Sequence, residues 1–503
     1  MICTSLSFAD FQINTHNTNN QSIPALAADA NGNFVVVWSS YDQDGDSGGI
    51  FGRHFDADSN PISSEFQINS TTAGNQSCPA IAMNPAGNFI VAWHGPGPND
   101  VDIFARRFDP DCLPASPEFR VNTNTFSTQQ NPRIAMSNTG RFVIVWESEQ
   151  TGTSSKVWRI SCQLYDSDGL PVGTESTINL LSQSRHPDVA MDGSGNFTVV
   201  WVQDDIYHSY NIIMARRYDS AGLPKADPCQ VSTTAFGTLT QPSIAMDGSG
   251  HFIVAWDGDP SLAGNDDIHA RRYKFDGTPL TGQFTVNTTT AGAQQNPKAT
   301  MNSQRDFIIV WNSESVPGSS IRDITGQRYD SFYNPIGDEF RINTYVVNDQ
   351  KYPAVIMDDA GRFISVWQSS GQDGSGWGIF GKIGPVIGSA DFTGDGFVNF
   401  ADYKFPASEW LKESIPLTAD LVDDNKVDHK DLSAFCEQWL NYCYDCNETD
   451  LHIDNQIDFY DYAIFANDWL KQGPNLAGDF TADGTVDFLD LIALTSHWTH
   501  SCQ

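Results

Sequence analysis

The C-terminal part of the chain repeats a stretch of twelve residues in which oxygen-bearing side chains recur at fixed positions. One copy, DFTADGTVDFLD, spans 479–490, and the other copies begin at residues 391, 420 and 450. Positions 1, 5, 9 and 12 are Asp or Asn, position 6 is Gly or Asn, and position 8 is Val or Ile. A cation that prefers about six to eight oxygen ligands, above all Ca²⁺, is bound by twelve-residue loops with this spacing.

The repeated stretch therefore predicts calcium loops, with position 7 contributing its backbone carbonyl. Position 3 separates the loops, because Thr393 and Thr481 offer a hydroxyl, Val422 offers nothing and His452 is a poor calcium ligand. We expect the first and fourth loops to bind Ca²⁺, and the inner two to be weaker candidates. The alternative is a set of acidic surface turns without metal. The predicted ligands are Asp391, Thr393, Asp395, Asn399, Asp402, Asp420, Asp424, Asp428, Asp431, Asp450, Asp454, Asp458, Asp461, Asp479, Thr481, Asp483, Asp487 and Asp490.

A helical segment is predicted after each loop. Apolar residues follow the closing Asp at intervals of three to four, which is typical of one helix face, and end at Trp410, Trp439, Trp469 and Trp498. A calcium loop followed by one helix and repeated in this way resembles the dockerin family. The resemblance implies a small α-helical dockerin-like domain of two repeat pairs, 389–445 and 446–503. It also implies Ca²⁺ as the bound ion and a cohesin-type protein as a partner.

Two features of this segment leave alternatives open. In the dockerin family, loop positions 10 and 11 contact the partner, and here they are mostly apolar or aromatic, as in Phe459-Tyr460 and Phe488-Leu489. These side chains either meet a partner or pack the repeats together. Cys443, Cys446 and Cys502 lie near helix ends, where they form disulfides if the protein is exported or, less plausibly, a zinc site.

The preceding part of the chain contains seven related units, each marked by a tryptophan at the end of a string such as GNFVVVW. The tryptophans are 53 to 56 residues apart and are Trp38, Trp93, Trp146, Trp201, Trp256, Trp311 and Trp367. Each unit contains four short β-branched or aromatic segments separated by Gly, Pro, Asn and Asp, as expected for four strands. The repeats predict a mainly β fold, a seven-bladed β-propeller over residues 8–385, with an open solenoid as the alternative.

The ends of the repeat array favour a closed ring. The string FQIN, which ends each unit, also occurs at residues 11–14 before the first complete unit. The last unit stops after IFGKI at 379–383 and lacks its fourth strand. The N-terminal strand is therefore expected to complete the last blade and remove its exposed edge.

Repeated residues are more easily explained by packing than by ligand binding. Because a tryptophan occupies the same place in every unit, we expect these side chains to be core residues rather than an aromatic ligand ring. The repeated arginines are expected to be strand-surface stems or ion pairs rather than a carboxylate clamp. They are Arg106, Arg107, Arg216, Arg217, Arg271 and Arg272.

A ligand surface is expected where the repeat is least regular. The loops between the second and third strands vary in length and sequence, and the loops between successive units are rich in Asn, Thr and Gln. Both sets belong to one face of a propeller, where a glycan or protein ligand is expected. Scattered aromatic residues among the polar side chains suit a glycan or a protein ligand and are Tyr41, Trp158, Tyr207 and Trp377. The alternative is a set of solvated loops without a ligand.

The charge of the chain excludes some partners. The 503 residues carry a net charge of −34 at a pI of about 4.4, and residues 391–503 hold 22 Asp and Glu against 5 Lys and Arg. Such acidity argues against nucleic acid as a partner. No apolar run approaches the ~20 residues of a membrane span. The first residues do not have the pattern of a signal peptide, so a truncated start is expected if the protein is secreted or displayed on the cell surface.

Three functions remain open at this stage. The first is a secreted bacterial calcium-binding protein whose propeller binds a carbohydrate or protein and whose tail attaches it to a cohesin-type partner or the cell surface. The second is a polysaccharide-degrading enzyme, a glycoside hydrolase or lyase, with the same tail. No acid pair stands out for catalysis, since Asp204, Asp205, Asp266 and Asp267 are ordinary for acidic loops. The third is a purely structural surface protein.

Overall fold

The computed structural model describes residues 10–150, 156–179, 183–204, 210–233, 239–259, 265–314 and 321–384. These residues belong to one compact unit, Ala9–Ile387. The predicted dockerin-like pairs, 389–445 and 446–503, and all the predicted calcium ligands lie outside them. The described residues include no helix long and apolar enough to cross a membrane.

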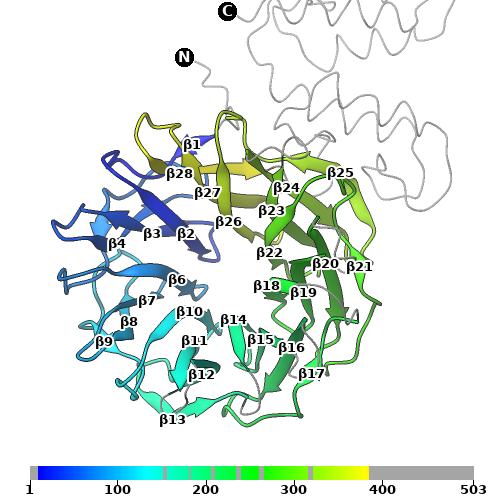
Figure 1. Cartoon of the computed structure of the whole chain (residues 1–503), viewed down its shortest axis with the longest axis horizontal. Coiled ribbons are helices and arrows are strands. Elements are labelled where there is room, and N and C mark those ends of the chain that lie inside the picture. The colour runs from blue at the N-terminus through cyan, green and yellow to red at the C-terminus, as the bar shows by residue number, and fades with distance from the viewer. Residues whose placement is uncertain are drawn as a thin grey trace, which may run out of the picture. The chain divides into compact units, whose positions relative to one another are not determined.

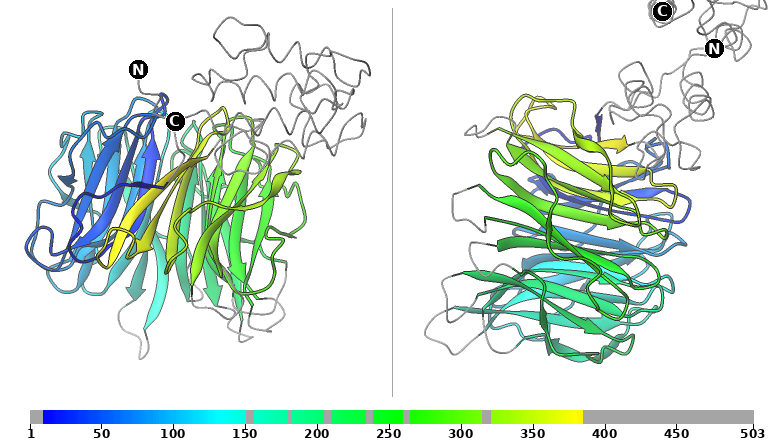
Figure 2. Two further views of the ribbon diagram at one scale, coloured as in Figure 1. Left: turned by 90° about the horizontal axis from the view of Figure 1, so that it is seen from above. Right: turned by 90° about the vertical axis from the view of Figure 1, so that its right-hand side faces the viewer.

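The described residues form seven four-stranded antiparallel sheets arranged in a ring (Figure 1). The prediction of a mainly β, seven-bladed propeller with four-stranded blades is confirmed. Figure 2 shows the sheets from the side, with their strands running between the two faces of the ring. The first strands of the seven blades surround the central channel, and each contacts the first strands of its two neighbours.

Blades 1 to 7 are numbered along the chain. Their innermost strands are β2 (Gln21–Ala28), β6 (Ser77–Met83), β10 (Gln129–Met136), β14 (Ser184–Met191), β18 (Leu239–Met246), β22 (Gln294–Met301) and β26 (Gln350–Met357). The second strands are β3 (Phe34–Tyr41), β7 (Phe89–Pro96), β11 (Phe142–Gln150), β15 (Phe197–Asp204), β19 (Phe252–Gly258), β23 (Phe307–Glu314) and β27 (Phe363–Ser370). The third strands are β4 (Gly48–Phe55), β8 (Val101–Phe108), β12 (Val157–Tyr165), β16 (Asn211–Tyr218), β20 (Asp267–Tyr273), β24 (Arg322–Tyr329) and β28 (Trp377–Gly384). The outermost strands are β5 (Phe66–Gln67), β9 (Phe119–Arg120), β13 (Pro171–Thr177), β17 (Cys229–Gln230), β21 (Phe284–Thr285), β25 (Pro335–Arg341) and, in blade 7, β1 (Phe11–Gln12).

The ring closes through the N-terminal strand, as the sequence predicts. Strand β1 pairs with β28 in the order β1-β28-β27-β26, with Phe11 opposite Gly381. The backbone N–H of Ile13 extends this pairing by donating to the Ile379 carbonyl at 2.9 Å. The closed ring excludes the open solenoid.

The repeated tryptophans are core residues, as expected. All seven are at most 1% exposed, and in blade 1 every residue of 34–38 is completely buried. Six of the indoles belong to core clusters with side chains of the preceding blade, as Trp146 does with Ile90 and Ala92. An aromatic ligand ring is therefore not what these side chains form.

Each tryptophan lies opposite a β-bulge in the innermost strand of its own blade. In blade 1, Ser22 pairs with Ser39 and Ala25 with Val37, so that two residues, Ile23 and Pro24, lie opposite Trp38 alone. The other six blades repeat this arrangement. Proline has no N–H for the ladder and is tolerated at an edge strand or a bulge, which explains its place on the channel edge of every blade.

The repeated arginines connect blades through backbone carbonyls. Arg106 donates to the Ile68 carbonyl of the preceding blade at 2.9 Å, and Arg216 and Arg271 make the equivalent bonds in their blades. The second arginine of each pair instead reaches the turn after the third strand of the next blade, as Arg107 does to the Ser167 carbonyl at 2.7 Å. These described partners are carbonyl groups, so the arginines stabilise the ring and are not a carboxylate clamp.

Ring closure in solution can be tested with two matched isoleucines. Ile13 in the closing strand segment and Ile68 at the same place in blade 1 are both completely buried. Replacing either with Ala leaves a cavity that costs about 3 kcal/mol of the free energy of unfolding. We expect equal losses for Ile13→Ala and Ile68→Ala in urea unfolding experiments. A loss for Ile68→Ala alone would show that the ring is open.

Candidate functional site at the channel mouth

The residues that follow the tryptophans differ from blade to blade, although their neighbours in the repeat are similar. These residues are Ser39, His94, Glu147, Val202, Asp257, Asn312 and Gln368. Each lies on a second strand, which packs against the innermost strand of the next blade. Most are buried polar side chains, with Glu147 at 1% and Asp257 at 3% exposed. The sequence analysis missed this ring because the residues read as a continuation of the apolar strand.

A second variable ring is formed by the residue before each bulge proline. All seven have left-handed backbones, with φ between 45° and 56°: Ile23, Cys78, Asn131, His186, Gln241, Asn296 and Tyr352. Such a backbone is unusual for residues other than glycine and costs about 1–3 kcal/mol. Each of these residues lies near the start of an innermost strand, at the end of the channel on the side of the variable loops. This end of the channel is the mouth.

The two rings are joined by hydrogen bonds between neighbouring blades. The N–H of His186 donates to Glu147 Oε1 at 2.7 Å, that of Asn296 to Asp257 Oδ2 at 3.1 Å, and that of Asn131 to His94 Nδ1 at 3.3 Å. The same bond joins blades 7 and 1, where Ile23 donates to Gln368 Oε1 at 3.0 Å. The bulge thus frees an N–H that a variable side chain of the preceding blade accepts.

Glu147 is the most fully hydrogen-bonded acid in these rings. Besides the bond from His186, its Oε2 accepts the side-chain amides of Gln130 at 2.9 Å and Asn131 at 3.0 Å. The three donors come from the first strands of blades 3 and 4. Glu147 is thus held in the channel wall by two blades.

Asp257 has a different environment and a raised pKa. Burial, aided by the nearby charge of Asp266, raises the pKa of Asp257 to about 6, although hydrogen bonds from Thr240 and Asn296 oppose this shift. The Thr240 hydroxyl donates to Asp257 Oδ1 at 2.7 Å. Asp257 can therefore exchange a proton under mildly acidic conditions.

The histidines of the mouth are disfavoured as cations. Burial lowers the pKa of His94 to about 4, and the positive charge of Arg133 adds to this effect while Glu147 opposes it. The His94 ring accepts at Nδ1, which is consistent with a neutral ring protonated at Nε2. The pKa of His186 is also lowered, first by burial.

The variable loops lie on the face of the mouth, as the strand order requires. They contact one another in blade 1, where the N–H of Gly74 donates to Asp46 Oδ2 at 3.0 Å. Of the predicted aromatic residues, Tyr41 is 50% exposed, Trp377 lies under Lys351 with Nζ 5.8 Å from the ring centre, and Trp158 is buried beneath Arg185. Tyr207 lies outside the described residues. Tyr352, which the sequence analysis did not single out, is 46% exposed at the mouth itself.

Two of the four acids weighed earlier as catalytic candidates accept hydrogen bonds from neighbouring amide side chains. Asp267 Oδ1 accepts the Asn287 amide at 2.7 Å, and Asp266 Oδ2 accepts the Gln295 amide at 2.5 Å. Asp204 ends strand β15, and Asp205 lies outside the described residues. Within the described ranges, no three His, Cys, Asp or Glu side chains are placed to hold a metal ion.

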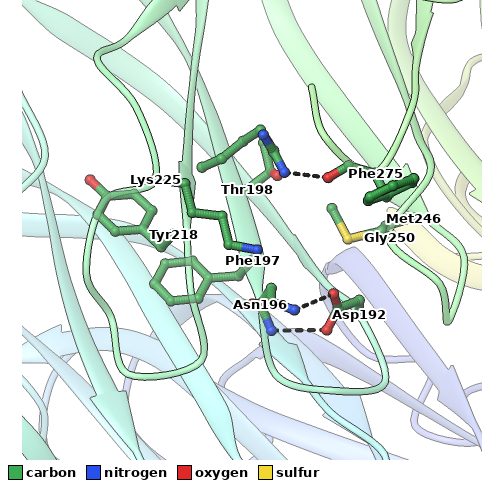
Figure 3. A pocket seen from close by; sticks show the side chains of 10 residues that line it. Asp192, Asn196, Phe197, Thr198, Tyr218, Lys225, Met246, Gly250 and Phe275 are labelled. Carbon is green, nitrogen blue, oxygen red and sulfur yellow. Dashed lines mark hydrogen bonds between the residues drawn. The ribbon is translucent and has the colours of Figure 1, made fainter. Parts of the chain in front are cut away.

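Hollows on the opposite face are too small or too regular to be the site. The one in Figure 3, between blades 4 and 5, measures about 20 Å³, room for roughly one water molecule. Its acid, Asp192, already accepts the Asn196 backbone N–H at 2.9 Å and side-chain amide at 2.7 Å. The equivalent hollow between blades 2 and 3 measures about 230 Å³, below the usual size of ligand pockets.

Comparison with known proteins assigns no family to this chain. No protein-family model matches the chain, and no curated protein matches it. An ulvan lyase from a new family of polysaccharide lyases is 11% identical with a TM-score of 0.47, covering 76% of this chain and 95% of its own. An α-L-arabinanase of Penicillium chrysogenum is 14% identical, with a TM-score of 0.42 and coverages of 60% and 92%. A protein of unknown function from Dyadobacter fermentans is 12% identical, with a TM-score of 0.43 and coverages of 63% and 96%. Such likenesses say nothing about this chain's ligand or activity.

The raised pKa of Asp257 predicts a pH-dependent stability difference. An acid whose pKa rises from 3.8 to about 6 on folding stabilises the fold fully below pH 3.8, and this contribution is lost as pH rises through 6. Asp257→Asn removes the loss, so the free energy of unfolding of the variant should rise by about 2 kcal/mol relative to the parent protein between pH 4 and pH 7. Urea unfolding at four pH values measures this gain, and a constant difference would contradict the assignment.

A His94→Gln variant provides the opposite control. Because the pKa of His94 falls from 6.5 to about 4 on folding, the parent protein loses stability as pH falls through this window. The variant lacks this loss, so its free energy of unfolding should gain on the parent as pH falls from 7 to 4. If the free energy of unfolding of His94→Gln instead rose relative to the parent as the pH increased, as expected for Asp257→Asn, the two pKa shifts would be misassigned.

Proposed function

We propose that the propeller is a glycan-binding module whose site is the channel mouth on the variable-loop face. We further propose that calcium-loaded, dockerin-like repeats in residues 389–503 attach this module, after secretion, to a cohesin-type partner or a cell surface. The observation that supports the first part is the pair of variable rings. Seven copies of one unit carry different side chains at these two equivalent positions around one opening, while the strand pairing that forms the ring is repeated.

The chemistry of the mouth suits a saccharide. Asn131, Gln241 and Asn296 present amides, His186 presents a ring nitrogen, and Tyr352 adds a half-exposed aromatic ring. Saccharide sites combine an aromatic platform with several fixed polar groups in this way. A purely structural protein has no need for side chains that differ at seven equivalent places.

An enzyme that cleaves polysaccharides is the second candidate, and one observation favours it. Glu147 and Asp257 are buried carboxylates on the same ring, and Asp257 has a pKa of about 6. Acids with a raised pKa serve as proton donors in glycoside cleavage. A reducing-sugar assay on neutral and acidic polysaccharides, with Asp257→Asn and Glu147→Gln as variants, separates the two. Product that disappears in these variants would make the protein an enzyme.

Glycan binding at the mouth is tested by calorimetry on the full chain with neutral and acidic oligosaccharides. Tyr352→Ala should weaken binding about tenfold, because stacking on an aromatic ring contributes on the order of 1.4 kcal/mol. The matched control is Phe332→Ala, since Phe332 is 76% exposed in a turn of the opposite face. Equal affinities for both variants would place the ligand elsewhere, and binding of no saccharide would remove the glycan proposal.

Calcium binding is tested by titrating the full chain after removal of divalent ions. We expect two to four sites, and the double variant Asp395→Ala, Asp483→Ala should lose two of them. Both residues occupy position 5 of their loops. The control is Asp423→Ala, which removes an acid at position 4, where no ligand is predicted. The absence of binding at millimolar calcium would refute the predicted calcium loops.

A further inference from the structure

At one level of the channel, the charged residues are confined to one side. The residue after each bulge proline pairs with the residue before each tryptophan, so seven side chains occupy one level of the ring. Blades 7, 1 and 2 place alanines at this level, whereas blades 3 to 6 place polar or charged residues. The seven residues are Ala25, Ala80, Arg133, Asp188, Ser243, Lys298 and Ala354.

The acids near this level of the channel accept hydrogen bonds from the blades that form its wall. Asp188 Oδ2 accepts the backbone N–H of Ile244 in the next blade at 3.0 Å. Asp257 and Glu147, at the mouth, accept backbone and side-chain donors from the blades beside them. Their hydrogen bonds join the blades and hold the oxygens against the backbone.

The bases are left with free donors. Arg133 makes one described hydrogen bond, from Nη1 to the Pro132 carbonyl at 2.8 Å. Lys298 has no hydrogen bond or ion pair to another residue that the structure describes, although it is partly buried. Burial lowers the pKa of Lys298, and the positive charge of Arg133 lowers it further, while Asp188 and Asp257 oppose this effect.

Lys298 lies within electrostatic reach of charged groups from three other blades. The charges that act on it belong to Arg133, Asp188 and Asp257, which come from blades 3, 4 and 5, whereas Lys298 belongs to blade 6. It also acts on His186 at the mouth. Two cations with unfilled donors thus share one region of the channel just inside the mouth. Partly buried cations in such a position are stabilised by an anion that accepts hydrogen bonds from both.

We infer that Arg133 and Lys298 together bind the carboxylate or sulfate group of an acidic saccharide that enters the channel from the variable-loop face. This inference rests on the proposed glycan-binding function and narrows its ligand to an anionic glycan. Arg133 offers a planar fork for two oxygens, and Lys298 offers a point charge from the opposite wall. The alanines of blades 7, 1 and 2 leave the other half of the channel to the uncharged part of the sugar.

Acidic conditions should strengthen this binding. Lowering the pH protonates Asp257, which faces Lys298, Thr240, Asn296 and Asp266, and so removes a competing negative charge. His186, which faces Glu147, Arg133, Arg185 and Lys298, does not add to this effect, because burial lowers its pKa and disfavours the cation. The loss of the Asp257 charge favours an anion. With a sulfated oligosaccharide, whose own charge is constant, binding should be about tenfold tighter at pH 5 than at pH 8.

The test is calorimetry of the full chain with four probes: an oligogalacturonate, a sulfated oligosaccharide, a neutral oligosaccharide of similar length, and inorganic sulfate. Lys298→Met should weaken binding of the acidic probes at least tenfold, whereas Lys298→Arg should retain it. The control is Lys274→Met, since Lys274 is exposed in a turn of the opposite face. Thermal unfolding verifies that each variant folds, and Arg133→Gln provides a second loss if Lys298→Met does not fold.

The outcomes separate this inference from the proposed function. Tighter binding of the oligogalacturonate identifies a carboxylate ligand, and tighter binding of the sulfated probe identifies a sulfate ester. Binding of the neutral probe with equal affinity, unchanged in Lys298→Met, would overturn the anion site and leave the glycan module intact. If none of the saccharides binds, the proposed function and this inference both fail.

Discussion

The ring depends on the β-bulge that recurs in every blade, where two residues of the innermost strand lie opposite one tryptophan of the second strand. A proline cannot take part in a strand ladder, so each innermost strand bulges where it meets the tryptophan. The left-handed residue before the proline costs about 1–3 kcal/mol, which burial of a whole indole offsets. The bulge also frees one N–H at the channel edge. Where His94, Glu147, Asp257 or Gln368 accepts it, the strained backbone becomes a link between blades.

The acidity of the propeller has a structural use that its composition does not disclose. Carboxylates accept backbone N–H groups in the turns, as Asp192 does, and between blades, as Glu118 does from Ser70 at 2.7 Å. In blade 2, the side-chain amide of Asn122 donates to Asp102, which lies on the third strand. In blade 1, the equivalent Asn69 donates to Asp44, which lies in the loop before the third strand. Such acids satisfy polar groups that would otherwise be unpaired. An acidic loop is therefore weak support for a metal or catalytic site in this fold.

The number of blades, the closing strand and the packing of the tryptophans could be predicted because they follow from repetition. A tryptophan that recurs seven times in an apolar string is explained in every copy by packing in the core. The mouth could not be predicted, because Glu147 and Asp257 sit where a buried strand continues and nothing in strand alternation indicates a bulge. The sequence signal for the mouth was the residue after each tryptophan, because its type differs between the blades while the residues before it recur. The calcium loops, read by the same logic of repetition, remain a prediction.

A seven-fold scaffold can bind an asymmetric ligand only if its symmetry is broken, and this chain breaks it where the fold tolerates change. Arg133, Asp188 and Lys298 occupy places filled by alanine in three other blades, so no packing requirement of the sheet demands their side chains. The strand pairing at these places is made by backbone groups. Charge in the channel can therefore vary without loss of the ring. Arg133 and Lys298, which are partly buried and make no described hydrogen bond to another blade, are therefore not required by the packing of the ring.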